Sequence, residues 1–286
     1  MSSVLSDLIE LLRLDRLDEK HFRGTSQDLG WGQLFGGQVL GQSLSAAVQT
    51  VPSDRHVHSL HSYFLRFGNI QKPIDFTVES VRDGFSFSTR SVLATQNDVP
   101  IFQLTASFQT AGTGFSHQDP MPKTPDPEDL ITDAELWGRY FEKLPESMRA
   151  MGQKQRPIEL RPVAPLDPFV PTTAPPEHAV WMRATGTLPD DEMLHRCLLA
   201  YSSDFLFLPT AMRPHGITWL TPKVQIASVD HSIWFHRPFR MDDWLLHVMH
   251  SPSAFGGRGF VRGSVFSRDG KLIASTAQEG VMRNRR

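Results

Sequence analysis

Two similar segments of the chain, residues 61–110 and 231–281, lie about 170 positions apart. An apolar stretch with helical spacing precedes each segment, at 38–51 and 194–212. A fold that is used twice in one chain can pair with itself as a pseudo-dimer. The repeat therefore restricts the chain to two copies of one helix-then-strands unit.

The two copies differ at polar positions. The second predicted helix carries Asp204 where the first carries Leu44. At a constant offset of 171, the last strand of the second copy carries Gln278 where the first has Ser107. Because the copies otherwise share a pattern, these differences indicate where a functional site could lie.

Within each copy, the pattern changes from helix to strand. Apolar residues alternate along 74–80 and again along 85–93, and Asp83-Gly84 between them is a hairpin signal. We expect a helix followed by a long antiparallel meander. An additional short amphipathic helix is expected at 5–12, with Ser6 or Asp7 as its N-cap.

Twelve of the 21 prolines lie in residues 111–176. Proline fixes φ and removes a donor, so this stretch is predicted to be a connector, with one helix at Thr132–Leu144. The expected organisation is an N-terminal unit (1–115), a proline-rich connector (116–176) and a C-terminal unit (177–286).

The stretch 194–212 has almost no polar face, so the helix predicted there should be buried. A sheet wrapped around a buried helix is the hotdog arrangement. The predicted fold class is therefore α+β, with two hotdog units forming a double hotdog.

Composition narrows the range of partners. The net charge of −2 gives no electrostatic reason to expect nucleic acid or an anionic membrane surface. The single cysteine, Cys197, excludes an intramolecular disulfide and suits a reducing compartment. With no apolar run of about 18 residues and no secretion signal at the N-terminus, we expect a soluble cytoplasmic protein without membrane insertion.

Asp204 is the strongest candidate for chemistry. A lone carboxylate in an apolar helix is costly unless it is hydrogen-bonded or paired, so it can be a base or a structural residue bonded to its neighbours. Gln278 can hold a water, donating and accepting at once, or can be an exposed strand residue. Ser228 could complete a polar triangle, although a strand serine is weak evidence by itself.

The histidines and glycines suggest other sites. His56 and His58 would share one face of a strand, but no metal-binding motif accompanies them, so no metal is expected. His58 remains a rival general base. The glycine-rich loop at 30–37 lacks a dinucleotide-binding frame, so no cofactor is expected, and its role should be close packing before a helix whose N–H groups can face an oxyanion. Arginines that could meet an anionic ligand are Arg66, Arg90, Arg183, Arg237, Arg258 and Arg262.

Several longer motifs together carry a family resemblance. The chain resembles the bacterial acyl-CoA thioesterase II (TesB-type) family over nearly all residues outside the connector. The motifs that carry the resemblance are Phe35-Gly36-Gly37-Gln38-Val39, His58-Ser59-Leu60-His61-Ser62-Tyr63-Phe64-Leu65-Arg66, Ser203-Asp204, Asp230-His231-Ser232-Ile233-Trp234-Phe235-His236-Arg237-Pro238-Phe239, Gly259-Phe260-Val261-Arg262-Gly263 and Ser275-Thr276-Ala277-Gln278-Glu279-Gly280-Val281-Met282-Arg283.

The resemblance implies a double hotdog that hydrolyses acyl-CoA to free fatty acid and CoA, in a homo-oligomer such as a tetramer. It implies a catalytic set of Asp204, Ser228 and Gln278. Ser228 stands where the family usually has threonine, which keeps the hydroxyl and loses the methyl. Phe67 stands where relatives commonly have proline. Two other functions stay open: a non-catalytic acyl-CoA-binding hotdog protein and a hotdog enoyl-CoA hydratase.

Overall fold

The computed structural model describes residues 2–30, 32–144, 146, 149 and 155–284. In this part of the chain, thirteen strands form one antiparallel sheet in the order β1-β2-β4-β5-β6-β3-β10-β13-β12-β11-β8-β7, and β9 also pairs with β13. The strands are β1 (Asp15–Arg16), β2 (His21–Gly24), β3 (Arg55–Phe64), β4 (Ile74–Asp83), β5 (Phe87–Gln96), β6 (Val99–Thr110), β7 (Ile158–Pro162), β8 (Glu177–Ala184), β9 (Val224–Ser228), β10 (Asp230–Phe235), β11 (Leu245–Phe255), β12 (Arg258–Ser267) and β13 (Leu272–Asn284).

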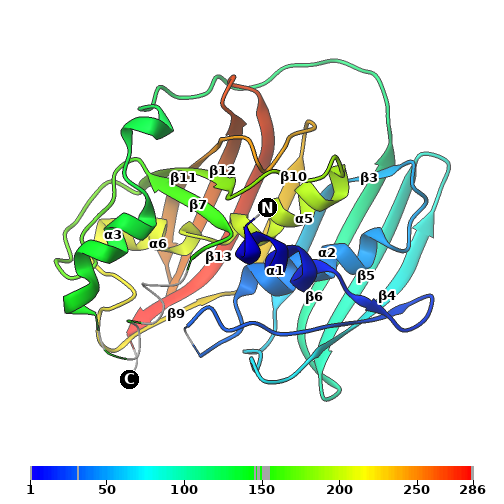
Figure 1. Ribbon diagram of the computed structural model, residues 1–286, viewed down its shortest axis with the longest axis horizontal. Helices are drawn as coiled ribbons and strands as arrows, with labels where there is room; N and C mark the ends of the chain where they lie inside the picture. Colours follow the sequence, from blue (N-terminus) through cyan, green and yellow to red (C-terminus); the bar gives the residue numbers. More distant parts are fainter. Residues whose placement is uncertain (1, 31, 145, 147–148, 150–154, 285–286) are drawn as a thin grey trace.

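The two halves of the sheet meet at β3 and β10, which pair antiparallel (Figure 1). His61 lies opposite Ser232 in this register, and its Nδ1 is 3.1 Å from the Ser232 hydroxyl. Next to β3 the strands follow in the order β6, β5, β4 and β2, and next to β10 they follow in the order β13, β12, β11 and β8. The two halves of the sheet therefore repeat one strand order. This symmetry confirms the predicted double hotdog.

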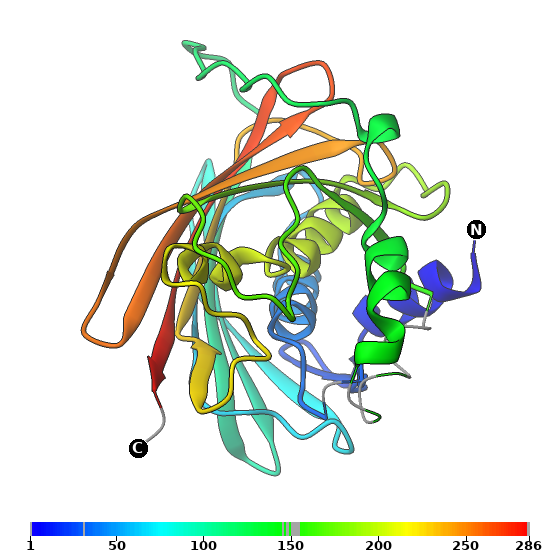
Figure 2. The ribbon, with the colours of Figure 1, turned by 90° about the vertical axis from the view of Figure 1, so that its left-hand side faces the viewer.

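Two buried helices lie side by side within the curved sheet, α2 (Gly36–Val48) and α5 (Glu192–Ser203) (Figure 2). They are antiparallel, because Gly37 faces the carbonyl of Tyr201 and Gly41 faces that of Cys197. A Cβ atom at position 37 would lie only 2.1 Å from the Tyr201 oxygen. The glycines after the loop therefore allow the close packing that the sequence predicted.

The second helix is interrupted, which corrects the expectation of one helix over 194–212. Helix α5 ends at Ser203 with Asp204 as its C-cap, and α6 (Phe207–Met212) begins after it. Leu206 between them has a φ of 60°, a left-handed conformation that non-glycine residues rarely adopt. Pro209 explains the break, since its ring would clash with the carbonyl of Phe205 in a continuous helix.

The shorter predicted helices are present with different ends. Helix α1 (Ser3–Leu12) is capped by Ser2, whose Oγ accepts from the N–H of Leu5, so the expected caps at Ser6 and Asp7 were wrong. Helix α3 (Asp133–Tyr140) is capped by Thr132 and continues as the 3₁₀ turn η2 (Phe141–Lys143). Among the described residues, no helix is long and apolar enough to cross a membrane.

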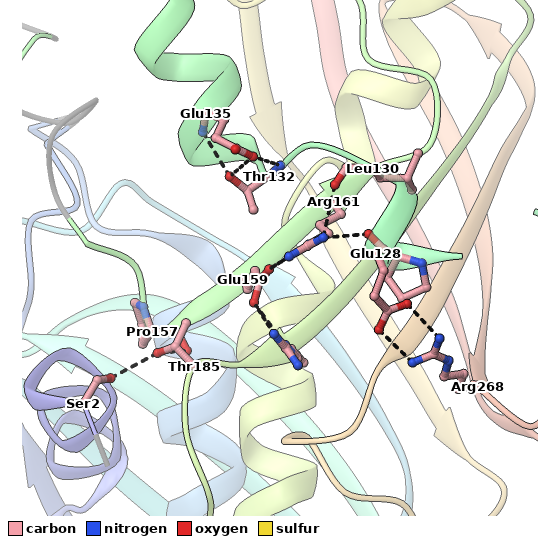
Figure 3. A network of polar contacts seen from close by, with 12 residues as sticks. Ser2, Glu128, Leu130, Thr132, Glu135, Pro157, Glu159, Arg161, Thr185 and Arg268 are labelled. Atoms are coloured by element: carbon pink, nitrogen blue, oxygen red, sulfur yellow. Dashed lines mark hydrogen bonds and ion pairs between the residues drawn. The ribbon is translucent and has the colours of Figure 1, made fainter. Parts of the chain in front are cut away.

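The connector packs on the second half of the sheet. Strand β7 lies within it and pairs with β8, a strand that the proline-rich composition did not predict. Figure 3 shows Arg161 of β7 beside Glu159 and the connector residue Leu130, while Arg268 of the sheet pairs with Glu128. The pair of Arg268 with Glu128, and a further pair of Arg183 of β8 with Glu159, tie the connector to the C-terminal unit.

A second apolar cluster lies under the connector, separate from the core around the helices. It consists of Trp181, Trp244, Leu246 and Phe266, with Met121 and Leu130 of the connector packed against it. Trp181 is 2% exposed and donates from Nε1 to the carbonyl of Pro125 at 3.0 Å. The connector thus closes an outer face that would otherwise expose two tryptophans.

We expect Trp181→Ala to lower the free energy of unfolding by about 3–5 kcal/mol, because it removes a buried ring and a hydrogen bond. Phe255→Ala is the matched control, since Phe255 is an aromatic residue at the end of β11 and is 87% exposed. Urea unfolding should show a loss of about 1 kcal/mol or less for the control. Equal losses in the two variants would contradict a stabilising role for the connector.

Candidate active site

Asp204 lies where the two buried helices and the sheet meet. The end of α5 places its carboxylate against the first turn of α2, where a Cβ on Gly36 would lie 2.6 Å from Oδ2. The backbone N–H of Gly37 donates a hydrogen bond to the same carboxylate. The first half of the chain therefore contributes a helix N-terminus, which favours negative charge, to an acidic residue of the second half.

Ser228 and Gln278 reach Asp204 from neighbouring strands. Gln278 of β13 donates from Nε2 to Asp204 Oδ1 at 3.2 Å and to Ser228 Oγ, on β9, at 2.6 Å. The pairing of β9 with β13 sets Ser228 opposite Gly280 and so brings its hydroxyl beside the amide. The structure thus brings together all three residues that the sequence singled out.

A second layer of polar groups lies behind Gln278. His231 of β10 is fully buried, with Nδ1 3.1 Å from Gln278 Oε1 and Nε2 2.9 Å from Ser203 Oγ. The sequence predicted no role for His231, although it lies in one of the motifs that carry the family resemblance. A role for His231 could have been suspected, because a histidine within a largely buried strand needs hydrogen-bond partners and this strand belongs to the copy that carries Asp204.

The surroundings of Asp204 change its acidity. Burial raises the pKa of the Asp204 carboxyl, while the hydrogen bonds from Gln278 and Gly37 act in the opposite direction. Burial lowers the pKa of His231, so this ring is neutral at neutral pH. The site therefore pairs a basic carboxylate with an uncharged imidazole.

A cavity of about 1500 Å³ opens onto the three residues. Its walls come from the glycine-rich loop, the end of β3, the connector helix α3 and the segment from Asp204 to Trp219. Most of the lining side chains are apolar, and aromatic rings of α3 contribute on one side, with Trp137 5.3 Å from Trp219. Such a cavity suits a long, largely apolar ligand.

Three arginines line the cavity: Arg66, Arg156 and Arg213. Only the first was among the arginines that the sequence proposed. Arg156 forms an ion pair with Asp133, whereas Arg66 and Arg213 donate to backbone carbonyls. The exposed Phe67 beside Arg66 also lines the cavity, so the departure from the family's proline lies at the rim of the site.

The rival residues lie elsewhere. His58 bonds through Nε2 to Ser107 Oγ at 2.8 Å and does not line the cavity, and His56 faces Glu192. Across the described part of the chain, no group of three or more His, Cys, Asp and Glu side chains is placed to share a metal ion. A hydratase would need a histidine poised beside Asp204. Both nitrogens of His231 are engaged with Ser203 and Gln278, and His178, which lines the cavity, makes no hydrogen bond to Asp204.

Comparison with known proteins gives a consistent family. Residues 25–109 match the acyl-CoA thioesterase N-terminal domain and residues 148–281 match the acyl-CoA thioesterase family. A hot dog fold protein from Alicyclobacillus acidocaldarius, 21% identical over 97% of the chain and 98% of that protein, has a TM-score of 0.76 and supports the fold.

Two relatives are much more similar in sequence. Acyl-CoA thioesterase 2 of Haemophilus influenzae is 46% identical over 283 residues, which is 99% of each chain. The crystal structure of acyl-CoA thioesterase II TesB2 from Mycobacterium marinum is 43% identical, covers 97% of this chain and 98% of that one, and has a TM-score of 0.78. Identity at this level over the full length shows that the chain belongs to the acyl-CoA thioesterase II (TesB-type) family.

Proposed function

We propose that the chain hydrolyses fatty acyl-CoA to a free fatty acid and CoA at the Asp204–Ser228–Gln278 site. The observation that carries this proposal is a basic carboxylate with two polar partners in the wall of a large, mostly apolar cavity. The similarity to acyl-CoA thioesterases supports the same reaction.

The proposed reaction is direct attack by water. Asp204 takes one proton as the water oxygen bonds to the thioester carbonyl carbon, and Ser228 and Gln278 hold that water in place. The tetrahedral intermediate then breaks its C–S bond, and the proton on Asp204 passes to the departing CoA sulfur. The products are a carboxylic acid and a free thiol, and no acyl-enzyme forms.

The start of α2 provides the developing charge with a favourable environment. Its positive end faces the site, so an oxyanion formed near Gly36 would be stabilised by the dipole of α2. Arg66 and Arg213 are the proposed partners of the CoA phosphates, because they line the cavity and do not form an ion pair in the described part of the chain.

Three expectations from the sequence stay predictions. The division into units at 1–115, 116–176 and 177–286 is one. A homo-oligomer, such as a tetramer, is the second, supported by the half-exposed aromatic side chains Tyr63 and Trp234 on the outer face where the halves meet. A cytoplasmic location is the third, supported by a single cysteine that is buried.

Asp204→Asn tests the base. We expect kcat to fall by at least about 100-fold, since general-base catalysis contributes this much. The ionised carboxylate costs stability above its raised pKa, so Tm at pH 7 should stay the same or increase. CoA release measured with a thiol reagent on a series of acyl-CoA esters checks the first effect, and thermal unfolding checks the second. Near wild-type turnover in the folded variant would remove Asp204 from the mechanism.

The pH dependence of kcat/KM tests the environment of Asp204. The base must be ionised, so activity should be lost as pH falls through its pKa. Because burial raises that pKa, the acid limb should lie above the usual range of an aspartate. A wild-type profile whose acid limb lies within the usual aspartate range would contradict this account.

Arg66→Ala tests the CoA end of the cavity. We expect KM for acyl-CoA to rise by about tenfold with little change in kcat, because a charge-assisted contact to phosphate is lost. Arg237→Ala is the matched control, since Arg237 donates to the carbonyl of Leu272 and does not line the cavity. Equal KM values in the two variants would assign the phosphates to other residues.

A further inference from the structure

We infer that His231 is a positioning residue that sets the orientation of the Gln278 amide, so that this amide keeps donating hydrogen bonds to Asp204 and Ser228. The inference rests on the proposed function of the site. It concerns a fully buried histidine that does not line the cavity.

The amide of Gln278 can be oriented in two ways, and its neighbours choose between them. One end faces Asp204 Oδ1 and Ser228 Oγ, and the other end faces His231 Nδ1. To act as a base, Asp204 must be ionised, and a carboxylate only accepts hydrogen bonds. The NH₂ group must therefore face Asp204, which leaves the amide oxygen facing His231.

This orientation requires a particular tautomer of His231. The amide oxygen of Gln278 needs a donor, so Nδ1 must carry the proton. The ring is neutral, and Nε2 then accepts a hydrogen bond. Ser203 supplies the donor, because its hydroxyl lies 2.9 Å from Nε2 and 3.0 Å from the carbonyl of Ala200, and can donate to either.

The residues form one polar line from the core to the cavity: Ser203, His231, Gln278 and then Asp204 with Ser228. The direction of hydrogen bonding is set from the cavity end: the ionised Asp204 can only accept, so Gln278 donates to it, His231 donates to Gln278, and the Ser203 hydroxyl donates to His231. The titratable groups whose charges act on His231 are Asp204, Asp230 and His247. None of them replaces the contact from Nδ1 to the amide.

Loss of the Nδ1 donor would leave the Gln278 amide oxygen buried without a hydrogen-bond donor. The amide would then no longer be held in place from that side, and its hydrogen bonds to Asp204 and Ser228 would weaken. The pKa of Asp204 would rise further as this donor weakens. The expected result is a lower kcat with substrate affinity retained, since the cavity walls are unchanged.

The first test reads the tautomer in the wild-type protein. ¹⁵N NMR of ring-labelled histidine, assigned by the signals that disappear in His231→Asn, should show the Nδ1–H form at neutral pH. An Nε2–H ring would overturn the inference. This measurement needs no substrate, so it stands even if the proposed function fails.

The second test compares variants. His231→Leu should lower kcat by about 10- to 100-fold with KM nearly unchanged, and should move the acid limb of the pH profile upward. His231→Asn keeps an N–H near the position of Nδ1 and should recover most of the activity. Ser203→Ala removes the donor to Nε2 and should give an intermediate loss.

His247→Leu is the matched control. His247 is equally buried and also lies beside the ring of Phe207, but it bonds to Thr276. It should lose stability as His231→Leu does and keep both kcat and the pH profile. Equal kcat losses in the two leucine variants, or an unshifted acid limb in His231→Leu, would make His231 merely structural.

The two proposals fail differently. If the wild type releases no CoA from any ester, the proposed function fails and the NMR result alone decides the role of His231. If the wild type is active and Asp204→Asn is not, the function holds, and the histidine variants then test the positioning role. If His231→Leu does not fold, Ser203→Ala and the tautomer remain as tests.

Discussion

A buried carboxylate needs hydrogen-bond donors to stay ionised. The packing of the two central helices and the last strand places such donors at Asp204. The donors come from two places: the first turn of α2, through Gly37, and the last strand, through Gln278. They converge only because the two helices pack closely enough for Gly36 to lie against the carboxylate. Neither half of the chain could build this site alone, since one supplies the helix start and the other supplies the acid.

The two halves share one architecture but use corresponding positions of the sequence differently. Leu44, which the sequence repeat sets against Asp204, is fully buried in the core, and Ser107, which it sets against Gln278, bonds to His58. The first copy therefore uses these positions for packing. The second copy breaks its helix at Asp204, where Pro209 and the left-handed Leu206 prevent continuation, and the break turns the carboxylate toward the cavity.

Much of the fold and of the candidate site could be predicted from the sequence, because the spacing of apolar residues and the internal repeat can both be read directly along the chain. The two units, the buried helices and the three polar residues all followed from pattern and family resemblance. The helix break was missed although Pro209 signalled it. The covering of Trp181 by Pro125 and Met121 could not be predicted, because these contacts join distant segments without any periodicity. The role of His231 depends on the hydrogen-bond direction of its neighbours, which only three-dimensional contacts define.

The central claim is that a water held by Asp204, Ser228 and Gln278 attacks the thioester directly. A single turnover with excess enzyme in H₂¹⁸O tests it, with mass spectrometry of both the fatty acid and the peptide that contains Asp204. Direct attack predicts ¹⁸O in the fatty acid from the first turnover and none in the peptide. An unlabelled first product together with ¹⁸O in Asp204 would show that the carboxylate itself forms a covalent bond to the acyl group, and would contradict the account.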